Sequence, residues 1–216
     1  MNKPLVNVNE DGKVYIKLLL WGCAGSGKTT AVDTLHKMAK EEDSESNLIP
    51  INDFKKIAME NGSTLYFDRG VFQSKSEKNL FYHIYTVAGQ DRFFPLRKKI
   101  FYGTDGIILV FDSQRSNRDR NINSLKELKN ICGEDLISKI PLLIMANKQD
   151  LPNTMRKEEI YQILDENNLI YPADHKLNIW NPIVYETIAL WDKKYNIYPL
   201  FAELVRRTTL YQLYDK

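Results

Sequence analysis

The stretch "GCAGSGKT", Gly22–Thr29, constrains the fold of this 216-residue chain more than any other feature. It matches the phosphate-binding pattern G-x-x-x-x-G-K-[ST], and it lies between the apolar run "KVYIKLLLW" and a segment with helical spacing. Glycines let a backbone wrap phosphate oxygens, and the helix that follows adds partial positive charge at its N-terminus. The pattern therefore predicts a strand, a phosphate-binding loop and a helix in that order.

Every residue of this loop is a candidate ligand of the phosphates. Lys28 would reach the terminal phosphates, and the Thr29 hydroxyl would bind Mg²⁺. The predicted cradle consists of Gly22, Cys23, Ala24, Gly25, Ser26, Gly27, Lys28 and Thr29.

The rest of the chain alternates between strand-like and helix-like patterns. Strands are expected over residues 13–22, 63–68, 79–89, 104–114, 140–150 and 181–189, and helices over 28–41, 121–132, 156–168 and 198–214. The strands 63–68 and 79–89 are expected to form a hairpin joined by a polar connection over 69–78. Alternation of this kind predicts an α/β fold with a mostly parallel, six-stranded sheet whose carboxyl-end loops form the binding crevice.

The length of the chain favours one domain over residues 14–214, after a polar lead-in over 1–13. Segment 170–182 has no clear periodicity and is expected to be an irregular insertion.

Composition excludes several kinds of partner. The chain carries 30 Lys and Arg against 28 Asp and Glu, so no polybasic field favours nucleic acid or an anionic membrane. No apolar run approaches the roughly 18 residues of a membrane span, and neither Asn2 nor the C-terminal "LYQLYDK" fits a lipidation signal. With only two cysteines, Cys23 and Cys132, a reducing, cytoplasmic location without an intrinsic membrane anchor is expected.

A second motif selects the base. "NKQD", Asn147–Asp150, follows the buried strand "PLLIMA", where a carboxyl-end loop would meet a bound nucleotide. The Asp150 carboxylate can accept hydrogen bonds from N1–H and N2–H₂ of guanine, which adenine does not offer. An ordinary polar turn is the alternative for a bare tetrapeptide, but its position after the phosphate loop favours a guanine site.

The order "GCAGSGKT", "TVAGQ", "NKQD", "ETIA" resembles that of the Ras-like small GTPases, and most closely the prokaryotic gliding-motility GTPases of the MglA type. The resemblance covers roughly residues 14–212. It implies a P-loop NTPase with a Ras-like G domain in three αβα layers, which binds GTP or GDP with Mg²⁺ and hydrolyses GTP slowly. It also implies an activating protein, an exchange protein and an effector as partners.

The resemblance assigns roles near the base. Asp150 would read guanine, Asn147 would brace the loops, Lys148 would pack along the base, and Ala189 would offer its N–H to the guanine oxygen. It also extends the phosphate-loop set to Thr30.

Three further residues would sense the γ-phosphate by the same resemblance. Thr64 would close on Mg²⁺ and the γ-phosphate, and Gly89 would donate its N–H to that phosphate. Gln90 would orient the attacking water and is the predicted catalytic residue. A simple strand start is an equal alternative for Thr64.

The chain departs from the family pattern at three positions. Thr86 stands where most Ras-like proteins have an aspartate that holds a magnesium-bound water, although the MglA type shares this replacement. Ala24 replaces a glycine, and Ser63 stands where MglA-type proteins often have an arginine that stabilises transition-state charge. These departures predict loosely held magnesium and slow intrinsic turnover.

Arg69, Arg92 and Arg97 could supply the missing arginine from within the chain, although solvated surface charges are the simpler interpretation of all three. Two other functions stay open. One is a GTP-binding scaffold with little or no hydrolysis, and the other is a P-loop kinase, against which "NKQD" and "ETIA" argue.

Overall fold

A computed structural model of the chain describes residues 7–8, 11–41, 46–51, 55–57, 67–88 and 94–214. The strands within this part are β1 (Asn7–Val8), β2 (Val14–Trp21), β3 (Leu48–Pro50), β4 (Lys55–Ile57), β5 (Phe67–Ser74), β6 (Leu80–Val87), β7 (Gly106–Asp112), β8 (Leu142–Asn147) and β9 (Ile183–Glu186). The α-helices are α1 (Lys28–Lys40), α2 (Phe94–Phe101), α3 (Arg118–Cys132), α4 (Lys157–Glu166) and α5 (Ile197–Tyr214).

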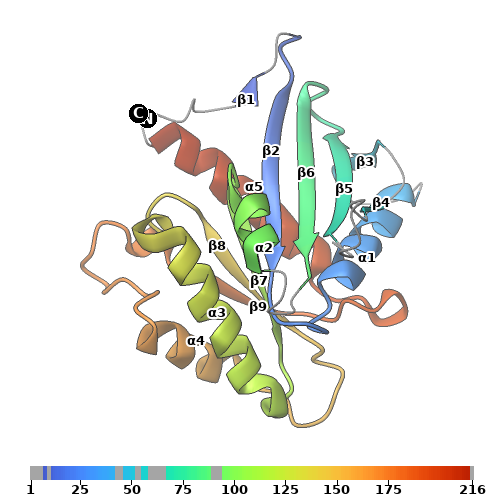
Figure 1. The fold of residues 1–216 in the computed structure, drawn as a ribbon. Coiled ribbons are helices and arrows are strands. Elements are labelled where there is room, and N and C mark those ends of the chain that lie inside the picture. Colours follow the sequence, from blue (N-terminus) through green and yellow to red (C-terminus); the bar gives the residue numbers. More distant parts are fainter. Residues whose placement is uncertain are drawn as a thin grey trace.

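The strands form one mixed sheet in the order β3-β5-β6-β2-β7-β8-β9, to which β1 adds beside β2 and β4 beside β5 (Figure 1). The pairs β6-β2, β2-β7, β7-β8 and β8-β9 are parallel, whereas β5 is antiparallel to β3, β4 and β6. The predicted α/β class with a mostly parallel sheet is confirmed.

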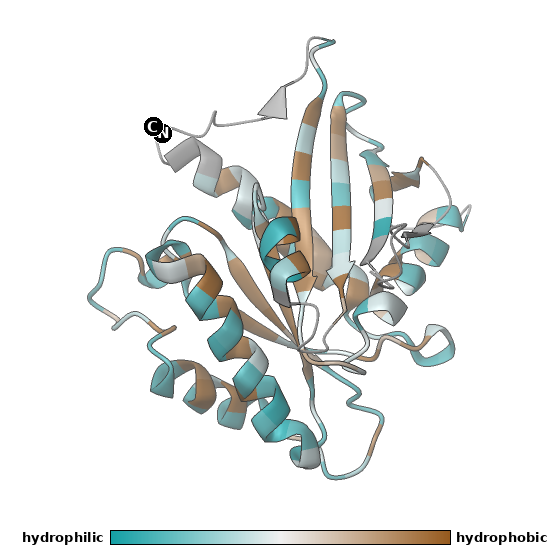
Figure 2. Cartoon of the chain, in the orientation of Figure 1, coloured by the Kyte–Doolittle hydropathy of each residue, from teal (hydrophilic) through white to brown (hydrophobic). Residues whose placement is uncertain are grey.

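Helices cover both faces of this sheet. Apolar side chains of α1 and α5 pack on one face, and those of α2, α3 and α4 pack on the other. Hydrophobic residues accordingly concentrate on the central strands, and hydrophilic ones on the outer sides of α3 and α4 (Figure 2). Since β7 and β8 are buried at every position, each is a continuous apolar run instead of an alternating one. The three-layer arrangement predicted for the fold is confirmed.

Strand β2 occupies the position where the chain order of the sheet reverses. It pairs in parallel with β6 on one side and with β7 on the other. The loops that leave the carboxyl ends of β2, β6, β7 and β8 therefore meet at one edge, which is where open α/β sheets bind ligands.

The predicted boundaries around β5 are wrong. The expected connection over 69–78 is strand as far as Ser74, and a turn is left only between β5 and β6. The order along the sheet also contains seven strands and not six, because β3 pairs with β5 at the edge. Helix α2 was not predicted, and α3 begins at Arg118, three residues before the expected start.

Segment 170–182 contains only a short 3₁₀ turn, Asn178–Trp180. Its irregular backbone is anchored by side chains. Trp180 is buried against the ring of Tyr211 at a centroid distance of 4.0 Å, and Arg207 donates to the backbone oxygen of Asn181 at 2.8 Å. Across the described residues, no helix has the length and apolar character that a membrane crossing requires.

Candidate functional site

The phosphate loop follows β2 and contains two glycines, Gly22 and Gly27, that no other residue could replace without strain. Gly22 has a φ of 150°, and an added Cβ would lie 2.3 Å from the backbone oxygen of Val110. Gly27 has a φ of 101°, and an added Cβ would lie 2.2 Å from Nδ2 of Asn147. Only glycine allows the loop to approach β7 and the end of β8 this closely.

Lys28 is the first residue of α1, and its ammonium group is folded back onto the loop. Nζ donates to the backbone oxygens of Gly22 and Cys23, both at 2.8 Å, and lies 3.5 Å from Oγ of Ser26. The side chain is buried. A buried ammonium beside the N-terminus of a helix attracts anions, and phosphate oxygens are stronger acceptors than these neutral carbonyls. The loop thus has the charge and shape of a phosphate cradle.

Asn147 connects three segments that are far apart in the sequence. Its Nδ2 donates to the backbone oxygen of Ser26 at 2.8 Å, and its Oδ1 accepts from the backbone N–H of Ala189 at 3.0 Å. Oδ1 also lies 3.5 Å from the hydroxyl of Thr187. This places the phosphate loop, "NKQD" and "ETIA" around one buried amide. The N–H of Ala189, predicted for the guanine oxygen, donates here to Asn147.

The other two residues predicted to contact the base, Lys148 and Asp150, each form an ion pair. Lys148 Nζ lies 2.7 Å from Oδ2 of Asp112, at the end of β7, and Asp150 Oδ2 lies 3.6 Å from Nζ of Lys193. The Asp150 side chain is 11% exposed, and Lys193 is the cation that lies beside it. Lys193 follows "ETIA" by four residues, and no pattern in the sequence indicates its contact with Asp150.

Asp112 and Thr34 also belong to the site, although neither was predicted. Asp112 ends a buried strand at the carboxyl edge of the sheet, which is the signal that could have identified it. Thr34 donates its hydroxyl from α1 to the backbone oxygen of Ala189 at 2.6 Å, and this contact has no counterpart in the sequence pattern.

The γ-phosphate sensors predicted from the sequence, Thr64, Gly89 and Gln90, lie outside the described residues, as do Ser63 and Arg92. Their roles stay predictions.

Two residues of the predicted magnesium site, Thr29 and Thr86, lie in the described part of the chain. Thr86 lies inside the described part, is buried, and pairs in register with Leu20 of β2. Thr29 is exposed in the first turn of α1, beside Thr30. The described residues contain no cluster of three His, Cys, Asp or Glu side chains that could hold a metal ion. Mg²⁺ needs only one or two protein ligands when phosphate oxygens and waters complete its shell, so the Thr29 hydroxyl fits this ion.

Two of the arginines considered as transition-state ligands are used elsewhere. Arg97 is buried, pairs with Glu127 and donates to the backbone oxygen of Ala88 at 3.3 Å. Arg69 Nη2 lies 3.3 Å from Nδ1 of His83, within the sheet. A different residue reaches the phosphate loop, since Arg120 Nη2 donates to the backbone oxygen of Ala24 at 2.9 Å.

The loop cysteine is a small buried side chain in the structure. Cys23 is buried, with Sγ 3.5 Å from Oδ1 of Asn121. Burial raises the pKa of the Cys23 thiol, and the nearby charges of Lys28 and Arg120 oppose this effect only in part. A thiol with a raised pKa is a poor nucleophile, so we assign Cys23 no catalytic or redox role.

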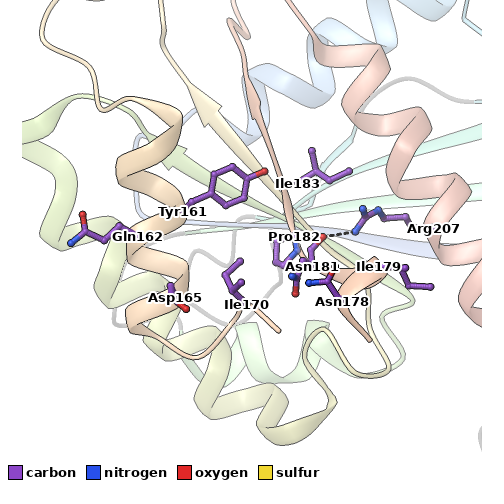
Figure 3. Close-up of a pocket in the computed structure, with 10 residues that line it drawn as sticks. All are labelled: Tyr161, Gln162, Asp165, Ile170, Asn178, Ile179, Asn181, Pro182, Ile183 and Arg207. Carbon is purple, nitrogen blue, oxygen red and sulfur yellow. Dashed lines mark hydrogen bonds between the residues drawn. The ribbon is translucent and has the colours of Figure 1, made fainter. Parts of the chain in front are cut away.

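A cavity of about 580 Å³ lies elsewhere (Figure 3). It is bounded by Tyr161 of α4, Ile179 of the irregular segment, Ile183 of β9 and Arg207 of α5. Ile183 begins β9, so the cavity lies at the amino end of that strand, opposite to the edge from which the site loops leave. None of the residues that line it is a predicted nucleotide ligand.

Comparisons with known proteins agree with this geometry. The sequence profile of the ADP-ribosylation factor family matches residues 4–192. The chain belongs to this family of Ras-like small GTPases. It is also 33% identical over 163 residues to the mutual gliding-motility protein MglA of Myxococcus xanthus (strain DK1622), an alignment that covers 73% of this chain and 79% of the relative. The resemblance to MglA-type GTPases is thus confirmed, and membership of the family makes this a GTP-binding switch protein in general terms.

Proposed function

We propose that the chain binds GTP and GDP with Mg²⁺ and slowly hydrolyses GTP, and that loss of the γ-phosphate releases the segments around Thr64 and Gly89. The observation that carries the proposal is the position of Asn147, whose amide holds the phosphate loop at Ser26 and the "ETIA" loop at Ala189. One bound nucleotide can then contact the phosphate loop and the base loop at the same time.

The proposed reaction is the hydrolysis of GTP by a water molecule. A water oxygen attacks the γ-phosphorus in line, and the bond from that phosphorus to the β–γ bridging oxygen breaks. The products are GDP and inorganic phosphate, which takes up the proton of the water. Gln90 orients this water, because its amide can accept from water and donate to the phosphate. Lys28 and the loop N–H groups stabilise the charge on the phosphate oxygens, and Thr29 and Thr64 would hold Mg²⁺, which would supply further positive charge there.

We propose that a partner protein binds one of the two states of the segments around Thr64 and Gly89. An activating protein and an exchange protein would set the ratio of the GTP-bound to the GDP-bound chain. Two buried, unpaired cysteines fit a reducing, cytoplasmic setting.

The test is phosphate release from GTP and from ATP with Mg²⁺ under single-turnover conditions. Unmodified chain is compared with Gln90→Leu and with Gln162→Leu, a control glutamine on α4 that bonds to Glu166. Release that is selective for GTP and falls only in Gln90→Leu supports a switch enzyme. Tight GTP binding without release from any of the three proteins would support the scaffold instead.

A further inference from the structure

The first turn of α3 is fixed against the phosphate loop by one buried residue. Asn121 is fully buried, donates to the backbone oxygen of Asp112 at 2.7 Å and accepts from its N–H at 3.1 Å. Its Oδ1 also meets the thiol of Cys23 in the loop. The residue before it, Arg120, is therefore held beside the loop by backbone that cannot shift without breaking buried hydrogen bonds.

The Arg120 side chain extends from this turn onto the phosphate loop. Nη2 donates to the Ala24 oxygen at 2.9 Å, and Nη1 donates to Oδ1 of Asn117 at 2.9 Å. Lys28 donates to the oxygen of Cys23, the residue just before Ala24. Two cations thus bind consecutive carbonyl groups of the loop, and one of them is the lysine expected to meet the terminal phosphates.

The contact with Ala24 is weaker than one that a phosphate would offer. Ala24 O is a neutral acceptor, whereas hydrogen bonds from arginine to phosphate oxygens are charge-assisted and roughly twice as strong. Arg120 is exposed, so its planar group can move without first losing buried contacts. These contacts engage two of the five N–H donors that a guanidinium carries.

We propose that Arg120 is a catalytic residue of the GTPase reaction, which supplies from within the chain the positive charge that Ser63 does not provide. The inference rests on the proposed hydrolysis. As the bond between the γ-phosphorus and the β–γ bridging oxygen breaks, Arg120 binds phosphoryl oxygens and stabilises the negative charge. It transfers no proton, and the products stay GDP and inorganic phosphate.

The chain offers a matched control on the same turn. Arg118 is also exposed, but its guanidinium lies 3.9 Å from the carboxylates of Asp119 and Glu166, away from the loop. Arg118→Ala removes the same charge from the same helix without touching Ala24.

The experiment compares unmodified chain with Arg120→Ala, Arg120→Lys and Arg118→Ala. Single-turnover phosphate release is measured, together with the affinity for GDP in the presence and absence of aluminium fluoride, which mimics the transferring phosphoryl group. We expect release to fall about tenfold or more in Arg120→Ala, since an arginine can contribute ~10³-fold or more in this reaction. Tightening of GDP binding by aluminium fluoride should be lost, while GDP affinity alone changes less than about threefold.

Arg120→Lys should recover part of the rate, and Arg118→Ala should match the unmodified chain. Release from Arg120→Ala at the rate of the unmodified chain would overturn the inference and leave the proposed hydrolysis intact. A parallel loss of GDP affinity and rate would show that Arg120 only supports the loop, which also overturns it. If the unmodified chain releases no phosphate, both proposals are overturned. Single-turnover phosphate release from the unmodified chain distinguishes this outcome from the failure of the Arg120 proposal alone.

Discussion

Asn147 Nδ2 lies 2.8 Å from the backbone oxygen of Ser26, 121 residues earlier in the chain, and this contact joins the base loop to the phosphate loop. Asn147→Ala should leave that oxygen and the N–H of Ala189 without their buried partner. A buried polar group that loses its partner costs about 1–3 kcal/mol. We expect a lower free energy of unfolding without nucleotide, and a loss of about tenfold or more in GDP affinity.

Urea unfolding and GDP titration measure the two effects of Asn147→Ala. Gln149→Ala is the control, because this amide belongs to the same loop but donates to the hydroxyl of Ser113 at 3.0 Å. GDP affinity equal to that of the control would refute the bracing role.

Gly27 and Gly103 provide a matched pair of glycines. Both have positive φ, 101° and 78°, but an added Cβ meets Asn147 only at Gly27, whereas no heavy atom lies within 4 Å at Gly103. Gly103→Ala should cost only the backbone strain of about 1–2 kcal/mol and leave GDP affinity unchanged. Gly27→Ala adds a clash with the bracing amide, so GDP binding should weaken by about a hundredfold.

Isothermal titration with GDP on both glycine variants separates strain from the clash. Equal affinities in Gly27→Ala and Gly103→Ala would mean that the loop can move away from Asn147 at little cost.

The sequence predicted those parts of the fold in which a local pattern has one physical cause. Strands β7 and β8 are apolar throughout because helices cover both faces of the sheet, and the run is visible without a structure. The phosphate loop is equally local, since its glycines and Lys28 are consecutive.

The predicted strand ended too early, at residue 68, because the segment over 69–78 was interpreted as a polar connection. Gly70 lies inside the strand, where an added Cβ would meet Val32 of α1 at 3.3 Å and the Phe72 ring at 2.9 Å. Close packing by a helix, and not a turn, requires glycine there.

The contact between Arg120 and Ala24 could not be predicted either, because it joins residues 96 positions apart that share no motif. Such contacts depend on how α3 packs beside the loop, and only the folded chain contains that information.

Lys193 pairs with the Asp150 carboxylate, which is predicted to bind guanine, so we expect the lysine to compete with the base. The pair is 3.6 Å apart, and the lysine side chain is 63% exposed, so the interaction is worth about 0.2–1 kcal/mol. Lys193→Gln should free the carboxylate and raise GDP affinity by up to about fivefold, with slower GDP release. Lys194→Gln is the control, because Lys194 lies over the Trp191 ring at 3.9 Å instead. Weaker GDP binding in Lys193→Gln than in Lys194→Gln would show that Lys193 assists the nucleotide.

We expect His83 to make the fold sensitive to acid. Burial, together with the nearby charges of Arg69 and Lys17, lowers the pKa of this imidazole from 6.5 to about 4. The Tyr15 ring packs beside it at a centroid distance of 5.0 Å. Between pH 6.5 and 4 the unfolded chain binds a proton at His83 that the folded chain does not, so the free energy of unfolding falls as the pH falls through this window. Above pH 6.5 both states are neutral at this ring, and its contribution is constant.

Urea unfolding without nucleotide at pH 7 and pH 5 measures this effect in the unmodified chain, in His83→Gln and in Arg69→Gln. After allowance for the partial exposure of the ring, the loss between the two pH values should be about 1 kcal/mol larger in the unmodified chain than in His83→Gln. Arg69→Gln removes one cause of the low pKa but not the burial, so it should reduce the loss without abolishing it. If all three proteins lose the same free energy of unfolding, other groups must cause the acid sensitivity, and the imidazole must gain its proton in the folded chain near its ordinary pKa.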